Sequence, residues 1–256
     1  MARRDDNTQA RLDRDLAELK LPEIAKSYRE VLAEAARKGS SMLEVLATLI
    51  GLEQTARQQR ALQRRLREAR LPKQKTLVEY DFNFPKRISK AAILQLFGCD
   101  FIERHGCAVL MGPTGTGKSH LLTALGYTAC ERGYSLRYTR VVDMINHLTT
   151  AQINGLLGKA LKVYVRPTLL LLDELGYLPI DKRGADLLFQ VVAARYESGS
   201  IVLTTNRTFR EWGALFDVDN TLATALIDRL MHHGEAIVIQ GDSYRMRDKD
   251  SDPPSA

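Results

Sequence analysis

Two hydrophobic patterns divide this chain of 256 residues. Up to about residue 70 the apolar residues recur at every third or fourth position, which is the spacing of one face of an α-helix. Beyond residue 100, short continuous apolar runs alternate with helical segments. Continuous apolar runs are typical of strands that are buried on both faces of a sheet. We therefore predict a helical N-terminal part followed by an α/β part.

Breaks in the helical pattern predict three helices in the N-terminal part. Pro22 separates the first two, because proline cannot continue a helix. Gly39-Ser40-Ser41 ends the second helix, and Ser41 and Glu44 have the spacing of a capping box. A long third helix is predicted from Met42 to about Arg70. We expect the apolar stripe of its first half to pack on the preceding helices; this stripe consists of Leu43, Leu46, Leu49 and Ile50.

The apolar runs of the second part predict the strands of a parallel sheet. The predicted strands are 107–111, 136–139, 168–172, 200–205 and 236–239. Helical segments separate them, and this alternation is typical of a parallel sheet with helices on both faces. One of these segments, 141–162, is longer than a minimal connection between strands requires. The fold class that we expect is α/β, preceded by a small all-α domain.

A glycine-rich motif lies between the first predicted strand and a predicted helix, and reads Gly112-Pro-Thr-Gly-Thr-Gly-Lys118-Ser119. Its glycines let the backbone turn so that its N–H groups converge on phosphate oxygens. The helix N-terminus adds free amides and a favourable dipole. In this P-loop motif the lysine reaches the β- and γ-phosphates and the serine ligates Mg²⁺. We predict an ATP and Mg²⁺ site made of Gly112, Pro113, Thr114, Gly115, Thr116, Gly117, Lys118, Ser119 and His120.

Polar residues end two further predicted strands, at the edge where parallel sheets bind ligands. Asp173 and Glu174 follow the apolar run 168–172. We expect Asp173 to hold Mg²⁺ together with Ser119, and Glu174 to accept a proton from an attacking water. A purely structural role is less favoured, because burying carboxylates without a cation is costly. Asn206 ends another buried strand, where it could align that water, although asparagine is also an everyday turn residue.

Hydrolysis also requires positive charge near the γ-phosphate in the transition state. Arg229 is the best candidate, because it follows the Asn206 strand on a predicted helix and could reach the nucleotide of a neighbouring subunit. The alternative is a salt bridge to Asp228 or Glu235. Arg245 is a weaker second candidate. The adjacent His232 and His233 have no carboxylate or cysteine at metal-ligand spacing.

Charge and cysteine content restrict the possible functions and partners only slightly. The formal charge of +6, from 37 basic and 31 acidic residues, is too small to decide a partner. The three cysteines are scattered, which favours reduced thiols in a cytoplasmic protein. The N-terminus lacks the apolar stretch of a signal peptide, and no apolar run has the length of a membrane span.

The second half of the long third helix carries a row of arginines on one face: Arg57, Arg60, Arg64 and Arg67. Glu68 is the acidic residue that we expect to oppose this charge. A face that is nearly all arginine favours binding to a nucleic-acid backbone. A solvated face, or an acidic protein partner, remains an alternative.

Taken together, these residues resemble AAA+ ATPases of the helicase-loader and initiator branch, and more closely the IstB-type helper ATPases of bacterial insertion sequences. The more specific segments are Asp-Glu-Leu-Gly-Tyr-Leu-Pro at 173–179 and Phe-Gln-Val-Val-Ala-Ala-Arg-Tyr-Glu at 189–197. Further matching segments are 19–25, 69–77, 204–207, 226–230 and 243–245. The resemblance covers nearly the whole chain.

This resemblance implies a P-loop AAA+ sheet and a role in transposition and DNA recombination. It implies a homo-oligomer that assembles with ATP on duplex DNA without sequence preference, and that recruits and stimulates an IstA-type transposase. It also implies that the helical insertion at 141–162 lines the DNA path, so that Lys159 and Lys162 join the arginines as candidate DNA contacts. A helical lid after the last strand is not expected.

The expected domains are a helical domain for DNA or partner binding (1–75), an AAA+ ATPase domain (76–247) and a disordered tail (248–256). The segment from Tyr80 to Pro85 is predicted to be an extended linker whose aromatic rings lie in a groove.

Two other functions stay open at this point. A DnaC-like replicative helicase loader would share the ATPase core but act on a helicase, although the arginine-rich helix and the segment 69–77 fit the transposition helper better. A P-loop small-molecule kinase is less favoured, because no acceptor-binding group of residues is visible and Glu174 with Asn206 suits water activation.

Overall fold

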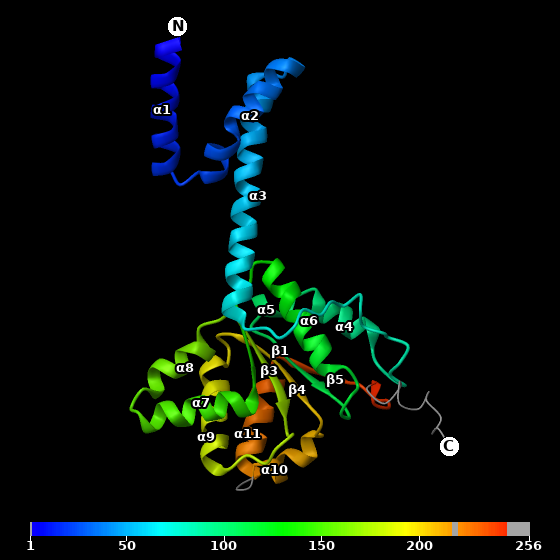
Figure 1. The fold of residues 1–256 in the computed structure, drawn as a ribbon. Helices are drawn as coiled ribbons and strands as arrows, with labels where there is room; N and C mark the ends of the chain where they lie inside the picture. The colour runs from blue at the N-terminus through cyan, green and yellow to red at the C-terminus, as the bar shows by residue number, and fades with distance from the viewer. Residues whose placement is uncertain (1, 217–219, 245–256) are drawn as a thin grey trace, which may run out of the picture. The chain divides into compact units, whose positions relative to one another are not determined.

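The computed structural model describes residues 2–216 and 220–244 (Figure 1). They belong to two compact units, an N-terminal unit of residues 1–64 and a C-terminal unit of residues 65–256. The boundary predicted from the sequence, after residue 75, lies further along the chain. The tail predicted at 248–256 and the candidate Arg245 lie outside the described residues. Among the helices that the structure describes, none is long and apolar enough to cross a membrane.

Three helices form the N-terminal unit, as predicted: α1 (Ala2–Glu18), α2 (Pro22–Lys38) and α3 (Met42–Ala69), which continues into the C-terminal unit. Pro22 occupies the first turn of α2, where its missing N–H is no loss. Gly39 ends α2 with a left-handed φ of 70°, which favours glycine. The predicted capping box is confirmed: the Ser41 N–H donates to the Glu44 carboxylate at 2.7 Å, and the Glu44 N–H donates to Ser41 Oγ at 3.3 Å.

The predicted packing of the apolar stripe on α3 is wrong for most of its residues. Leu43, Leu46 and Ile50 are exposed by 77%, 56% and 46%. The buried residues of this stretch are Val45 and Glu53, which lie eight positions apart and so share one helix face. This is the face that meets the start of α2, where Glu53 accepts hydrogen bonds. The start of α2 therefore covers only this line of α3 and leaves most of the apolar stripe exposed.

A five-stranded parallel sheet with the order β2-β3-β4-β1-β5 forms the centre of the C-terminal unit. The strands confirm the predicted runs: β1 (Cys107–Met111), β2 (Leu136–Arg140), β3 (Leu169–Leu175), β4 (Ser200–Thr205) and β5 (Gly234–Val238). β5 begins two residues before the prediction. Because β1 lies between β4 and β5, the ends of β3, β4 and β1 meet at one edge of the sheet.

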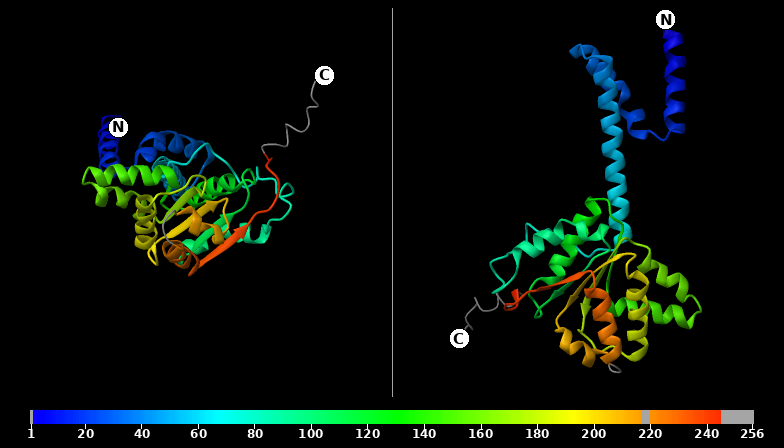
Figure 2. Two further views of the ribbon diagram at one scale, coloured as in Figure 1. Left: turned by 90° about the horizontal axis from the view of Figure 1, so that it is seen from below. Right: turned by 180° about the vertical axis from the view of Figure 1, so that it is seen from behind.

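Helices cover both faces of this sheet (Figure 2). One face carries α4 (Lys90–Phe97), the short α5 (Asp100–Glu103) and α6 (Lys118–Glu131). The other carries α7 (Val141–Ile153), α8 (Leu157–Val165), α9 (Lys182–Arg195), α10 (Trp212–Leu215) after the 3₁₀ turn Phe209–Glu211, and α11 (Asn220–Met231). The apolar side chains of β1, β3 and β4 form the core with α7, α9 and α11. The expected insertion at 141–162 is the pair α7 and α8, which turns at Gly155 with a φ of 68°.

A buried arginine joins the starts of β3 and β4 to the end of α8. Arg195 is 1% exposed, and its guanidinium donates to five backbone carbonyls. Those of Tyr164, Val165 and Pro167 accept from Nη1, and those of Thr168 and Ser200 accept from Nη2, all at 2.7–3.0 Å. Burial lowers the pKa of Arg195 to about 10, so the group stays charged at neutral pH. This one side chain therefore satisfies five backbone carbonyls at the end of the sheet where β3 and β4 begin.

Candidate functional site

The P-loop turns tightly between β1 and α6. Gly115 and Gly117 have φ values of 85° and 87°, in the left-handed region that favours glycine. A Cβ on Gly117 would lie 2.6 Å from the Tyr80 ring, so no larger residue fits there. Lys118 is 9% exposed, and its Nζ donates to the carbonyls of Gly112 and Pro113 at 2.7 and 2.6 Å. The loop therefore curls around its own lysine.

A cavity of about 660 Å³ opens beside this loop. That volume suits a small-molecule or cofactor ligand. Its walls are P-loop residues 114–120, the ends of β3 and β4 with Glu174 and Asn206, and part of the segment 72–85. The structure thus brings the predicted phosphate, base and water-aligning residues to one cavity.

Tyr80, Phe84 and Tyr244, which the sequence prediction did not assign to the site, line the cavity together with the predicted His120. The Tyr80 hydroxyl donates to the carbonyl of Thr116 at 3.2 Å, and burial raises the pKa of Tyr80 to about 12. His120 Nε2 lies 2.8 Å from the carbonyl oxygen of Thr76. The rings of Phe84 and Tyr244 meet edge to face at 4.8 Å. The signal in the sequence was the aromatic segment from Tyr80 to Pro85, of which Tyr80 and Phe84 line the cavity.

The last described residues of the chain also lie against the P-loop. Tyr244 donates its N–H to the carbonyl of Gly115 at 3.0 Å. Asp242 forms an ion pair with Lys86 at 2.9 Å, and Arg87 and Gln240 form an antiparallel bridge. Residues 84–87 and 240–244 therefore form one wall that borders the loop.

Asp173, at 2% exposure, is the most enclosed carboxylate of the site. The hydroxyls of Ser119 and Thr204 donate to its Oδ1, the first at 2.9 Å, and that of Tyr138 donates to Oδ2 at 2.8 Å. Burial and the nearby Asp173 charge raise the pKa of Tyr138, so its hydroxyl keeps its proton. A carboxylate beside a serine hydroxyl is the set of hard oxygen donors that Mg²⁺ takes, and these residues therefore fit that ion.

Glu174 and Asn206 are exposed at the adjacent strand ends and face the same cavity. Glu174 has a left-handed φ of 63°, which is unusual for a residue with a side chain. Gly176, two residues on, has a φ of 90°, and a Cβ there would lie 3.2 Å from Asn206 Oδ1. The backbone at the end of β3 is thus bent, and Glu174 and Asn206 line the same cavity.

Arg229 lies on α11, apart from the residues that line this cavity. Its guanidinium stacks on Phe189, 4.6 Å from the ring centroid, and donates to the carbonyl of Ala225 at 3.1 Å. The sequence analysis offered a salt bridge to Asp228 or Glu235 as the alternative role of Arg229. Among the described residues, Arg229 contacts Phe189 and Ala225 and forms no such salt bridge. To act on a nucleotide, Arg229 would need the site of another chain.

The structure places a carboxylate beside the histidine pair, which sequence spacing did not indicate. The rings of His232 and His233 are 4.2 Å apart, and Glu197 Oε1 lies 3.9 Å from His233 Nε2. The Tyr196 hydroxyl lies 2.8 Å from His232 Nδ1. Since Glu197 and both histidines are exposed, we regard them as a surface cluster.

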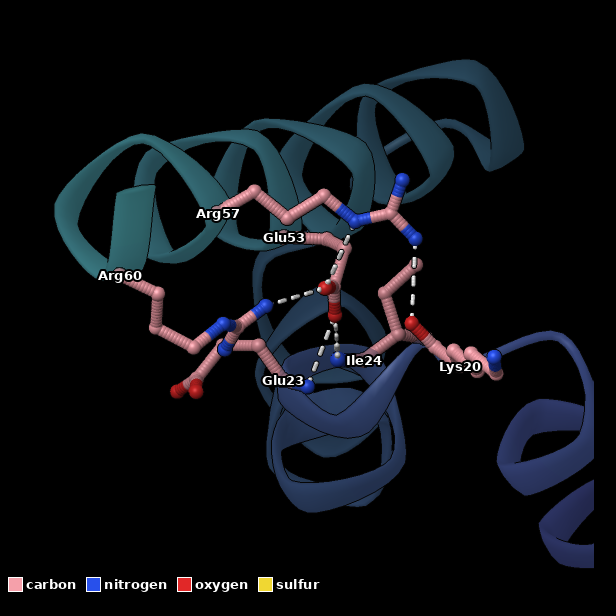
Figure 3. A network of polar contacts seen from close by, with 6 residues as sticks. All are labelled: Lys20, Glu23, Ile24, Glu53, Arg57 and Arg60. Carbon is pink, nitrogen blue, oxygen red and sulfur yellow. Dashed lines mark hydrogen bonds and ion pairs between the residues drawn. The ribbon is translucent and has the colours of Figure 1, made fainter. Parts of the chain in front are cut away.

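Two of the four stripe arginines bind an acidic partner within the N-terminal unit (Figure 3). Glu53 Oε1 accepts from Arg57 at 3.2 Å and from Arg60 at 2.9 Å. Its Oε2 accepts the backbone N–H groups of Glu23 and Ile24 at 2.8 and 3.3 Å. The expectation that Glu68 is the acidic residue opposing the charge was incomplete, because Glu53 lies four and seven residues before the two arginines on the same helix.

These contacts fix the charge of Glu53. Burial opposes its ionised form, but the backbone N–H groups and the two arginines outweigh that effect and lower the pKa of Glu53. Leu21 gives α2 no side-chain cap, so Glu53 supplies one from α3. Arg64 and Arg67 are exposed further along α3, and Lys159 and Lys162 are exposed on α8.

Comparison with known proteins decides the family. Residues 14–252 match the family of IstB-like ATP binding proteins. The chain belongs to this family. A Geobacillus stearothermophilus protein named as an ATP-binding protein of insertion sequence IS5376 is 38% identical over 231 residues, which cover 90% of this chain and 92% of that protein. The ATP-binding character of the family agrees with the P-loop cavity.

Solved structures share the fold of the C-terminal unit. AMPPCP-bound DnaA from Aquifex aeolicus has a TM-score of 0.56 and 23% identity, covering 70% of this chain and 54% of that one. The DnaC helicase loader has a TM-score of 0.52 and 22% identity, covering 64% of this chain and 96% of that one. The predicted fold class is confirmed: a P-loop AAA+ sheet with a helical N-terminal region.

Proposed function

We propose that this protein is an ATP-dependent DNA-binding transposition helper. It assembles with ATP as a homo-oligomer on duplex DNA, hydrolyses ATP, and recruits and stimulates an IstA-type transposase. The observation that carries the proposal is the cavity lined by the P-loop, Glu174 and Asn206, with Asp173 buried behind it on Ser119, in a chain of the IstB-like family. Its curated relatives are named for insertion sequences, which favours transposition over other AAA+ roles.

The residues in and beside the cavity have separate roles in ATP hydrolysis. The backbone N–H groups of residues 114–119 and the Lys118 ammonium bind the phosphates, and Lys118 leaves its loop carbonyls to do so. Ser119 and Asp173 would hold Mg²⁺, which neutralises phosphate charge when it is bound. Glu174 takes the proton of the attacking water, which Asn206 orients.

Arg229 completes the site of a neighbouring subunit. It lies on α11, outside the cavity of its own chain, and its guanidinium is held by Phe189 and Ala225 rather than by a carboxylate. A cation held in this way keeps its charge available for the γ-phosphate of another chain. Hydrolysis therefore depends on assembly.

Exposed basic residues provide the DNA surface. Arg64 and Arg67 on α3, and Lys159 and Lys162 on α8, are exposed. Arg60 uses one nitrogen on Glu53, and Arg57 uses one on Glu53 and one on the carbonyl of Lys20. About half of each side chain is exposed, which leaves further donors for phosphate. Contacts of this kind bind the DNA backbone without reading its sequence.

A DnaC-like helicase loader is the second candidate, because the DnaC structure shares the ATPase fold. That likeness, at 22% identity, supports the fold and not the partner. The relatives with 38% identity are named for insertion sequences, and they favour the transposase.

ATP turnover measured against protein and DNA concentration tests the proposal. We expect turnover per subunit to rise with protein concentration and with added duplex of any sequence, and the Lys118→Ala variant to lose both ATP binding and assembly. A turnover per subunit that changes neither with DNA nor with protein concentration would contradict an assembly-dependent ATPase.

A further inference from the structure

The pairing of β3 with β4 changes register at the acidic pair. Leu172 pairs with Leu203, but the next paired residues are Leu175 and Thr205. Asp173 and Glu174 on β3 therefore stand opposite Thr204 alone on β4. Such a bulge re-aims a side chain beside an active site. Here it turns Glu174 out of the sheet into the cavity while Asp173 stays buried.

The hydroxyl of Thr204 occupies the centre of this bulge. Thr204 is 1% exposed, so water does not replace its contacts. Its Oγ1 accepts the N–H of Glu174 at 2.9 Å and donates its proton to Asp173 Oδ1. A hydroxyl has one proton to donate and can accept in the same arrangement. One side chain on β4 thus binds the backbone of Glu174 and the side chain of Asp173.

Glu174 needs such support, because its conformation is unfavourable. Its φ of 63° places a residue with a side chain in the left-handed region. Residues in that region persist only where their surroundings hold them, and they cluster at functional sites. The N–H of Glu174 has lost its place in the strand ladder at the bulge, and Thr204 Oγ1 provides its acceptor.

We propose that Thr204 is a positioning residue that aims the Glu174 carboxylate at the attacking water. This role rests on the proposed function, in which Glu174 is the base. Thr204 acts through the Glu174 backbone, whereas Asn206, two residues later on the same strand end, faces the water itself. The orientation of the base and the alignment of the water are therefore both set at the carboxyl end of β4, by Thr204 and by the residue that follows the strand.

Substitution of Thr204 by valine tests this role. Thr204→Val keeps the branched shape but removes the acceptor for Glu174 and one donor to Asp173, and Thr204→Ser keeps both. We expect Thr204→Val to lower kcat by roughly 10- to 100-fold with ATP binding nearly unchanged, since small misplacements of reacting groups cost about this much. Thr204→Ser should recover most of the loss. If the valine variant does not fold, Thr204→Ala repeats the test with a smaller side chain.

A matched control and a double variant separate positioning from simple destabilisation. Ser200→Ala removes another fully buried hydroxyl from the same strand, at the end far from the cavity, and should leave kcat unchanged. Thr204→Val combined with Glu174→Gln should be no slower than Glu174→Gln alone, because residues that act as a unit are not additive.

The outcomes distinguish this role from the proposed function. If Thr204→Val keeps full kcat, or its loss multiplies with that of Glu174→Gln, the positioning role is overturned while the ATPase assignment stands. If Glu174→Gln itself turns over at the wild-type rate, the assignment of the base fails, and the positioning role fails with it.

Discussion

Removal of the Arg195 guanidinium should destabilise the C-terminal unit severely. Arg195→Met keeps the length of the side chain but leaves five buried carbonyls without this donor. Each hydrogen bond to a charged group contributes about 1.5–3 kcal/mol, an upper sum of about 7–15 kcal/mol. Burying the guanidinium without a carboxylate offsets much of that sum. We therefore expect a loss of about 3–5 kcal/mol, as for the breaking of other buried ionic networks.

Trp212 provides the assay. It is the only tryptophan of the chain and is fully buried in the core of the C-terminal unit, so its fluorescence follows the unfolding of that unit. With a urea dependence of about 3 kcal/mol per molar, the expected loss lowers the unfolding midpoint by about 1–2 M. Arg166→Met, an exposed arginine at the end of α8, is the matched control and should stay within about 0.5 kcal/mol of wild type. An Arg195→Met midpoint equal to that of this control would refute the reasoning.

Three further predictions concern the site and the N-terminal unit. Glu174→Gln should bind ATP normally but lower turnover on the order of 10²-fold or more, measured by phosphate release; unchanged turnover would mean that another group activates the water. Replacing Arg64 and Arg67 by glutamine should reduce the log–log salt slope of DNA binding by roughly two units, measured by fluorescence anisotropy; an unaltered slope would remove these residues from the DNA surface. Because its contacts lower the pKa of Glu53, its stabilisation is present above the unfolded-state pKa of about 4.3 and is lost as pH falls through the folded-state pKa. Circular dichroism should therefore show the N-terminal helices melting at lower temperature below about pH 4 in the wild type, and much less pH dependence in Glu53→Gln.

The strands and the P-loop could be predicted because each is a local pattern. A continuous apolar run such as 168–172 specifies a buried strand, and glycines at 112, 115 and 117 specify the turn. Residues at the carboxyl ends of parallel strands share one edge, so the meeting of Asp173, Glu174 and Asn206 followed from topology alone.

The supporting contacts could not be predicted, because they join residues that are distant in the sequence. Tyr138 meets Asp173 only through the pairing of β2 with β3. Thr204 meets Glu174 only through a β-bulge, which the hydrophobic pattern of the sequence does not predict. The role of Glu53 depends on the α2 start, 30 residues earlier. The apolar stripe of α3 misled for a related reason: periodicity shows which face is apolar, but not how much of it the neighbouring helices cover.

The central claim, that each nucleotide site is completed by a neighbouring subunit, is tested most directly by mixing two inactive variants. Arg229→Ala lacks the arginine but keeps Glu174, and Glu174→Gln lacks the base but keeps Arg229. In an equal mixture at saturating DNA, about a quarter of the interfaces pair an intact base with a donated arginine, so turnover should rise toward about a quarter of wild type. A mixture that stays as inactive as its two components would contradict completion of the site in trans.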